Sequence, residues 1–155
     1  PTRGRVRNIA FENLVVSSPG RCCVEGLPDA PIENIAFRNV TWNVTGPLLT
    51  EKIRKPAGSR RTVRDPNAVE HIARPYHLVA VNVADLEVSG FRLYDRVPPG
   101  GGSPARGFCY LNNVRHAVLE RLRILPPGAG AEFLQCAACS DVRHDASLQS
   151  AAKEG

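Results

Sequence analysis

Basic residues are concentrated in one stretch of the chain, between Thr45 and Arg74. Arginine and lysine bind anions, and the planar guanidinium of arginine pairs in a bidentate manner with carboxylates. Glycine and proline residues in the same stretch indicate a loop. The plainer interpretation is a solvated flap, and the functional hypothesis is a binding site for an acidic ligand. Five residues are predicted to bind such a ligand: Arg54, Lys55, Arg60, Arg61 and Arg64.

Carboxylates, thiols and imidazoles elsewhere could also support chemistry. Asp85 and Asp141 are candidates for a catalytic carboxylate pair. Cys136 and Cys139 form a single Cys-x-x-Cys motif, which is a weak zinc or redox signal because strong ones contain two such pairs. We predict no metal and no cofactor. The remaining candidates lack metal-ligand spacing and are expected to be solvated or locally bonded: His71, His77, His116 and His144.

The composition limits the possible classes of protein. The 155 residues suffice for one domain with a core, and 43% apolar and 23% charged residues are ordinary for a globular protein. No apolar run approaches about 18 residues, so we predict no membrane span. The net charge of +5 permits an acidic partner, either nucleic acid or an anionic polysaccharide. Without an initial methionine or a signal region, we interpret the chain as a fragment or mature product, with its localisation left open.

A repeated segment organises the chain. Residues 6–16 match residues 32–42, an offset of 26 residues from Val6 to Ile32, and further copies begin at Val83, Val114 and Cys139. Apolar residues in these copies alternate with period two, which predicts strands with one buried face. The first aligned column contains Ile9, Ile35, Leu86, Ala117 and Val142, and the next contains Phe11, Phe37, Val88 and Leu119.

The alternation then shifts by one residue. The next apolar columns are Leu14, Val40, Phe91 and Leu122, followed by Val16, Trp42, Leu93 and Ile124. Such a slip would turn the buried face outward unless the chain bends there, so we predict a corner. The corner column is Asn13, Asn39, Gly90 and Arg121. Asparagine and glycine tolerate left-handed backbone, whereas Arg121 does not fit this expectation.

A second strand precedes each copy, at residues 21–26, 76–83, 108–114 and 133–139, and no window has helical spacing. Units of about 25 residues made only of strands bury a core by stacking. We therefore predict an all-β domain over residues 1–142, a β-solenoid of about five coils with a loop insertion at 45–74. Residues 143–155 form a polar tail.

The columns favour structural roles for several candidates. Asp85 and Asp141 share a column with two asparagines, which predicts turn residues that cap backbone groups. Cys136 aligns with Leu111, and Cys139 aligns with Val114. Because these positions point inward, we interpret both cysteines as core residues. The odd total of five cysteines argues against a disulfide framework.

Three segments resemble a known family: residues 6–14 (VRNIAFENL), 24–35 (VEGLPDAPIENI) and 37–40 (FRNV). They are similar to glycoside hydrolase family 28, the polygalacturonases and rhamnogalacturonases of the pectin-lyase-like superfamily. Residues 81–95 and 106–125 look like late coils of bacterial members. The resemblance covers about residues 4–142. It implies a right-handed single-stranded parallel β-helix and inverting hydrolysis of galacturonan-type glycosidic bonds.

Inversion requires a carboxylic acid that protonates the leaving oxygen and a carboxylate that activates water, about 6.5–9.5 Å apart. The family supplies them from Asn-Thr-Asp and Asp-Asp motifs, beside Gly-His-Gly and Arg-Ile-Lys motifs. None of the four is present. The resemblance therefore implies that the chain is a C-terminal scaffold fragment, inactive alone, with no catalytic residues and with the catalytic aspartates upstream. The implied partner is a pectin-type acidic polysaccharide, bound by a secreted or periplasmic parent.

Two other functions stay open. A non-catalytic β-helix, serving as a carbohydrate-binding or adhesion module, would share the same columns. A nucleic-acid binder would be expected to interleave aromatic residues with basic ones. The stretch between Thr45 and Arg74 contains no aromatic residue, so this function ranks last and no nucleic-acid partner is predicted.

Overall fold

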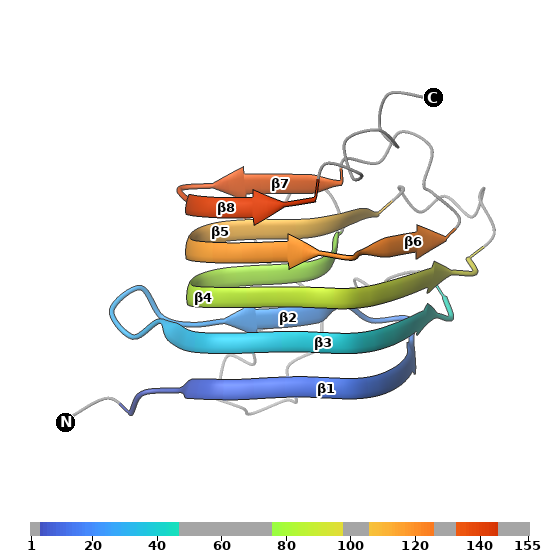
Figure 1. Ribbon diagram of the computed structural model, residues 1–155, viewed down its shortest axis with the longest axis horizontal. Coiled ribbons are helices and arrows are strands. Elements are labelled where there is room, and N and C mark those ends of the chain that lie inside the picture. Colours follow the sequence, from blue (N-terminus) through green and yellow to red (C-terminus); the bar gives the residue numbers. More distant parts are fainter. Residues whose placement is uncertain (1–3, 47–75, 98–105, 126–132, 146–155) are drawn as a thin grey trace, which may run out of the picture.

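The computed structural model describes residues 4–46, 76–97, 106–125 and 133–145. These residues form an all-β structure of eight strands in one sheet, and none of them is helical (Figure 1). No helix in the described ranges is therefore long and apolar enough to cross a membrane. The strands are β1 (Arg7–Ser18), β2 (Cys22–Glu25), β3 (Ile32–Val44), β4 (Tyr76–Asp95), β5 (Gly107–Glu120), β6 (Arg123–Leu125), β7 (Leu134–Ala137) and β8 (Ser140–His144).

All of the strand pairs are parallel. The central order is β1-β3-β4-β5-β7, while β2 and β6 pair with β4, and β8 pairs with β5. In Figure 1, β4 and β5 each run along the back of the stack, bend at its left end and return along the front. The pairs β2–β3 and β7–β8 follow the same path with an interruption. Parallel strands thus lie in successive layers.

The predicted columns are confirmed by the register. Ile9 pairs with Ile35, which pairs with Leu86, and the column continues through Ala117 to Val142. The predicted column from Phe11 to Leu119 is paired in the same way. Beyond the corner, Val16 pairs with Trp42, Trp42 with Leu93, and Leu93 with Ile124. The sequence repeat is therefore a repeat of strand pairing.

The predicted corner is also confirmed. Asn13, Asn39 and Gly90 have φ values of 55°, 52° and 64°. Arg121 was expected not to fit, and this expectation is wrong because its φ is 53°. A left-handed arginine is unfavourable alone. Here its amide donates to Asp145 Oδ2 at 2.7 Å and its guanidinium Nη2 donates to Ser89 Oγ at 2.5 Å, so local hydrogen bonds stabilise the bend.

Two more left-handed columns produce the bend at the left end of the stack. One is Asn8, Asn34, Asp85, His116 and Asp141, with φ values from 52° to 63°, so the two aspartates lie at turns as predicted. The other, Asn82, Asn113 and Ala138, was not identified from the sequence. It precedes the first column by three residues. Two left-handed residues so close together turn a strand sharply without a separate loop.

Asparagine side chains join the layers at these bends. The amide of Asn34 donates to Asn8 at 2.9 Å, that of Asn39 to Asn13 at 2.7 Å, and that of Asn113 to Asn82 at 2.7 Å. Asn82 also donates to the carbonyl of Gly26 at 2.9 Å. Asparagine therefore combines tolerance of left-handed backbone with a side chain that can hydrogen-bond to its equivalent in the next layer.

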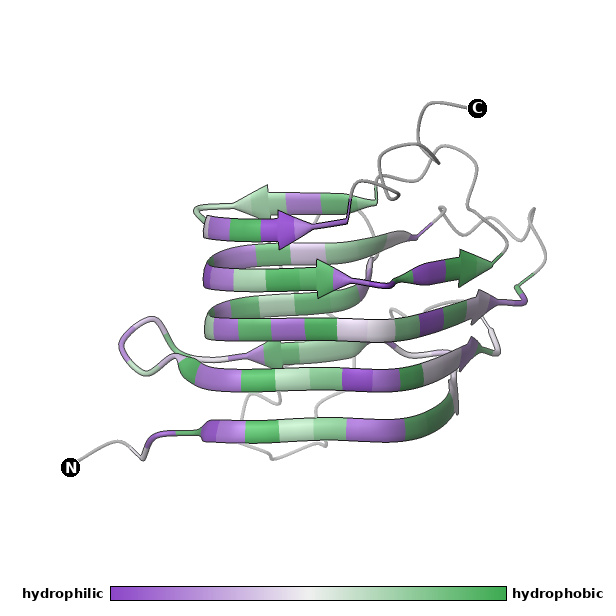
Figure 2. Cartoon of the chain, viewed as in Figure 1, coloured by the Kyte–Doolittle hydropathy of each residue, from purple (hydrophilic) through white to green (hydrophobic). Residues whose placement is uncertain are grey.

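The inward columns form one apolar core. Fully buried members include Val88, Leu111, Val114 and Leu119, and hydrophobic and hydrophilic residues alternate along the strands (Figure 2). The core is incomplete at β1, where Phe11 is 40% exposed and Leu14 is 38% exposed. Their column partners in β3 are buried. Among the described strands β1 pairs only with β3, so one side of its apolar residues is uncovered.

A second apolar cluster lies on the opposite face of β4 and β5. Val79 and Val81 alternate along β4 with residues of the main core, and they cluster with Tyr76 and Tyr110. All four are buried. The first part of β4 is therefore buried on both faces, whereas many strands have one face exposed to water.

Truncation of a core leucine should destabilise the protein far more than truncation of an exposed one. Leu111 is fully buried, whereas Leu27 is 50% exposed. We expect Leu111→Ala to lower the free energy of unfolding by about 2–5 kcal/mol because it leaves a cavity. Leu27→Ala should change it by roughly 0.5 kcal/mol or less. Urea denaturation measures both, and equal losses would contradict the core described above.

Candidate functional site

The five predicted ligand-binding residues, Arg54, Lys55, Arg60, Arg61 and Arg64, lie outside the described residues. Their role stays a prediction. The structure does place the two ends of this stretch. The carbonyl of Gly46 accepts a hydrogen bond from Arg106 at 3.1 Å, and Tyr76 pairs with Gly107. Gly46 and Tyr76, the described residues on either side of the undescribed stretch, therefore both lie near the start of β5.

Arg106 connects three segments at this edge. Its guanidinium also donates to the carbonyls of Gly20 and Pro19, at 2.9 and 2.8 Å, which lie in the connection between β1 and β2. Burial lowers the pKa of Arg106, and Asp95 opposes this lowering. The guanidinium stays charged at neutral pH because its ordinary pKa is so high. It holds connections from separate layers together where the insertion begins and ends.

His77 lies beside Arg106 in the interior. It was expected to be solvated or locally bonded, but it is only 6% exposed, and its Nδ1 has no hydrogen-bond partner among the described residues. Its Nε2 lies 3.7 Å from Asp95 Oδ2. Burial, followed by the charges of Arg106 and Arg21, lowers the pKa of His77 to about 3. The ring is therefore neutral at physiological pH and cannot supply a cation.

Charged side chains form a network on the outer face of the front strands. Arg38 in β3 donates to Glu87 in β4 through Nε at 2.8 Å and Nη2 at 2.6 Å, and to Glu12 in β1 through Nη1 at 2.7 Å. These side chains are exposed, so water screens the ion pairs and they stabilise the fold only weakly. The hydrogen bonds with Glu87 and Glu12 raise the pKa of Arg38, and the bond from Arg38 lowers the pKa of Glu87.

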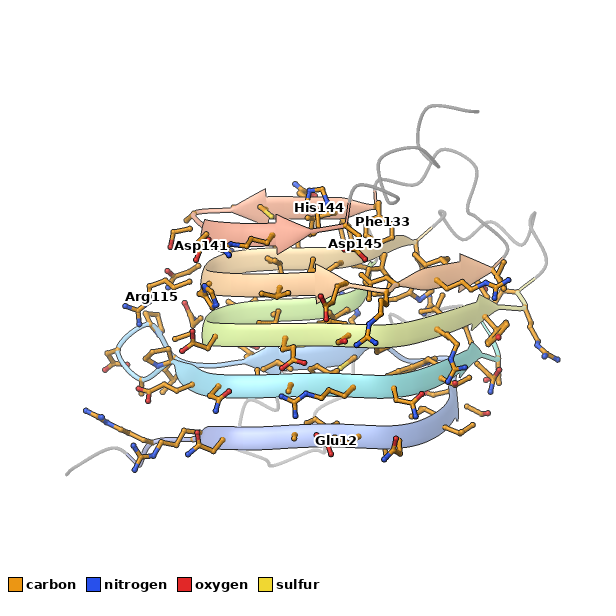
Figure 3. The ribbon with its side chains drawn as sticks, in the orientation of Figure 1. Glu12, Arg115, Phe133, Asp141, His144 and Asp145 are labelled. Carbon is orange, nitrogen blue, oxygen red and sulfur yellow. The ribbon has the colours of Figure 1, made fainter. Side chains whose placement is uncertain are left out.

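The network continues toward the later strands. Arg92 donates to Asn39 at 2.8 Å, and Ser89 donates to Glu120 at 3.2 Å. Arg121 lies 3.7 Å from the same Glu120 carboxylate. Figure 3 shows the labelled Glu12 on the first strand and Asp145 near the last one. Cations and carboxylates alternate on this face, and the arginines of the network already have protein partners.

The carboxylates at the bend do not form a catalytic pair. Asp85 and Asp141 occupy one column, but His116 lies between them. His116 Nδ1 is 2.5 Å from Asp141 Oδ2, and Arg143 Nε is 3.1 Å from Asp141 Oδ1. The hydrogen bond with His116, followed by that with Arg143, lowers the pKa of Asp141. Figure 3 shows Asp141 and Arg115 at the end of the stack where the strands bend.

These electrostatics have a direct chemical consequence. A general acid in glycoside hydrolysis needs a raised carboxyl pKa so that it is protonated when the bond breaks. Glu87 and Asp141 have lowered pKa values, which favours the ionised form. Neither carboxyl group is suited to protonate a leaving oxygen.

The cysteines differ from the core residues that were expected. Cys136 pairs with Leu111, which confirms its column, but its side chain is exposed, so the prediction that it is buried is wrong. Among the described strands β7 pairs only with β5, and no strand covers its other side. Cys139 is partly buried and packs against the core. All five cysteines are free thiols.

Sequence reasoning did not identify the interactions of His77, Arg38 and Glu87. For His77 and Arg38, however, the alignment of the columns contains a signal. His77 precedes Leu78, which is paired with Cys109, so His77 aligns with Phe108 as a polar residue in an apolar column. Arg38 aligns with Glu12 at an offset of 26 residues. The contact of Arg38 with Glu87 is diagonal between columns, and column matching cannot reveal it.

His77 should make the protein less stable as the pH falls below about 6.5. The unfolded imidazole binds a proton near that pH, whereas the folded one stays neutral down to about pH 3. Between these values the unfolded state binds more protons, so the free energy of unfolding decreases with falling pH by at most about 1.4 kcal/mol per pH unit. Urea denaturation between about pH 7.5 and 5.5 measures this slope.

The matched control is His77→Phe, because phenylalanine occupies the next positions of that column. This variant should lose most of the pH dependence in that range, while His144→Gln, at an exposed position, should retain it. An unchanged slope in His77→Phe would mean that His77 is not the titrating group.

Within the described ranges, no group of three or more histidine, cysteine, aspartate or glutamate side chains is arranged to hold a metal ion. The site is thus a charged outer face together with the edge at which the basic insertion begins and ends. Comparison of the chain with protein-family models, curated proteins and solved structures found no match to any of them.

Proposed function

We propose that the chain is the C-terminal scaffold portion of a pectin-type polysaccharide hydrolase, built as a right-handed parallel β-helix. The observation that carries the architectural part is the column from Ile9 to Val142, which runs through four successive parallel pairings. Bends at left-handed residues return the chain to the same face in each layer. The enzymatic part is supported by the resemblance of residues 6–40 to glycoside hydrolase family 28.

The proposal assigns the catalytic carboxylates to further coils stacked on β1. Two features support this arrangement. The apolar residues Phe11 and Leu14 are partly exposed there, although they belong to columns that are buried in the next layer. A strand edge with exposed apolar residues favours pairing with another strand. A coil of the same repeat would cover both the edge and these side chains.

The basic insertion would bind the substrate. Galacturonate units carry carboxylates, and arginine binds carboxylates through two parallel hydrogen bonds. The arginines of the outer face are engaged by Glu12, Glu87 and Glu120, whereas the stretch between Thr45 and Arg74 has an excess of basic residues. This favours the insertion over the charged network as the site that contacts an acidic polysaccharide.

The decisive experiment compares this chain with a longer product of the same reading frame. We expect the sequence upstream of Pro1 to contain an Asn-Thr-Asp and an Asp-Asp motif. The longer protein should release reducing ends from polygalacturonate with inversion at the anomeric carbon, and asparagine at either motif aspartate should abolish the release. The 155-residue chain alone should release none.

Either of two outcomes would contradict the proposal. Hydrolysis by the 155-residue chain alone would place the catalytic acid within it. A longer protein that has the repeats but lacks the motifs, and that binds polygalacturonate without cleaving it, would establish the alternative, a non-catalytic carbohydrate-binding module.

Charge reversal tests the binding role of the insertion. Arg60→Glu combined with Arg61→Glu should weaken binding of oligogalacturonate roughly tenfold or more, since a loss of about 1.4 kcal/mol is tenfold. The matched control is Arg7→Glu with Arg115→Glu, which changes the net charge equally at exposed positions of β1 and β5. Isothermal titration of the longer protein measures both, and equal weakening would indicate a general charge effect.

A further inference from the structure

Cys136 and Cys139 lie on the two sides of one left-handed bend. Ala138 between them has a φ of 52° and occupies the column of Asn82 and Asn113. Cys136 pairs with Leu111 and is the penultimate residue of β7, and Cys139 directly precedes β8. The bend thus brings two inward-pointing side chains, three positions apart in the sequence, toward each other.

The two thiols influence each other, because burial and then the neighbouring Cys139 raise the pKa of Cys136. Cys139 Sγ donates to the carbonyl of Ala137, a residue within the same bend, at 3.3 Å. The Cys136 side chain is exposed, and Cys139 is partly buried. A reagent in solution can therefore reach one thiol of a pair whose second thiol is already adjacent.

The other cysteines differ in this respect. Cys109 is fully buried in the core, and Cys22 and Cys23 are both less exposed than Cys136. In the equivalent bend of the preceding layer, the two flanking inward positions are Leu111 and Val114, both fully buried. At the bend between β7 and β8 the two equivalent positions are instead an exposed thiol and a partly buried one.

We propose that Cys136 and Cys139 form a reversible dithiol–disulfide site whose co-reactant is a low-molecular-weight disulfide such as oxidised glutathione. The Cys136 thiolate attacks one sulfur of the disulfide, giving a mixed disulfide and one glutathione thiolate. The Cys139 thiolate then attacks the Cys136 sulfur and displaces the second glutathione thiolate. The protein loses two electrons to the glutathione disulfide, and both thiol protons go to solvent or to the departing thiolates.

The surroundings distinguish this site from a catalytic dithiol and from a zinc site. Catalytic Cys-x-x-Cys motifs have a lowered thiol pKa. Burial and the neighbouring Cys139 instead raise the pKa of Cys136 to about 11, so exchange is slow at neutral pH and accelerates with rising pH. No third ligand for a metal is arranged beside the pair within the described residues. The product is a slowly exchanging bond across the last bend.

The test uses the full chain incubated with oxidised glutathione at about pH 8.5, where the thiolate fraction is larger. Remaining thiols are then alkylated, and tryptic peptides are weighed. Residues 124–143 form one tryptic peptide that contains Cys136 and Cys139 and no other cysteine, whereas Cys109 lies in the separate peptide of residues 107–115. We expect the first peptide to lose two hydrogen atoms and the second to remain a free thiol until unfolding.

Three variants complete the test. Cys136→Ser and Cys139→Ser should each give at most a mixed disulfide with glutathione, and Cys109→Ser should leave the internal bond unaffected. In the unmodified chain, the rate should rise about tenfold per pH unit between neutral pH and pH 9. Recovery of the 124–143 peptide with both cysteines alkylated, or each carrying glutathione, would overturn the proposal, as would pairing of either cysteine with Cys109.

Discussion

The structure depends on left-handed backbone at regularly placed residues. A parallel stack can bury one continuous core only if every layer turns back at the same position with the same side chains pointing inward. Each turn requires a residue that tolerates positive φ, and most of these positions are asparagine, glycine or aspartate. His116, Arg121 and Ala138 occupy the others, and for the first two side-chain or amide hydrogen bonds accompany the bend. The bends thereby determine which residues of each strand form the core.

Stacking of equivalent positions has opposite consequences for apolar and charged residues. Apolar columns gain burial with each added layer, as the difference between Phe11 and Phe37 shows. Like charges stacked in one column would repel each other, so they must alternate in sign or be bridged by an opposite charge. Arg38 bridges Glu12 and Glu87 in this way. The outer face is therefore already electrostatically satisfied. Recognition of an acidic polymer would need cations that are not part of such a network, which is why the basic insertion is the better candidate.

Ionisable groups away from that face are controlled by desolvation. Burial holds His77 neutral, whereas Arg106 stays charged because its ordinary pKa is so high, and it donates to backbone carbonyls of two connections. Both residues lie where successive layers are joined, the edge from which the insertion departs.

The sequence by itself determined the local features: the strands, the columns, the register and the corner at Asn13, Asn39 and Gly90. These follow from period-two alternation and backbone sterics, which depend on near neighbours in the chain. Only the tertiary structure decided how deeply each column is buried, so that Leu111 lies in the core while Cys136 in the same column is exposed. It also decided the contact of Arg38 with Glu87 and the neutral state of His77. Burial and diagonal contacts depend on which layers lie on either side, and that information is spread over residues far apart in the sequence.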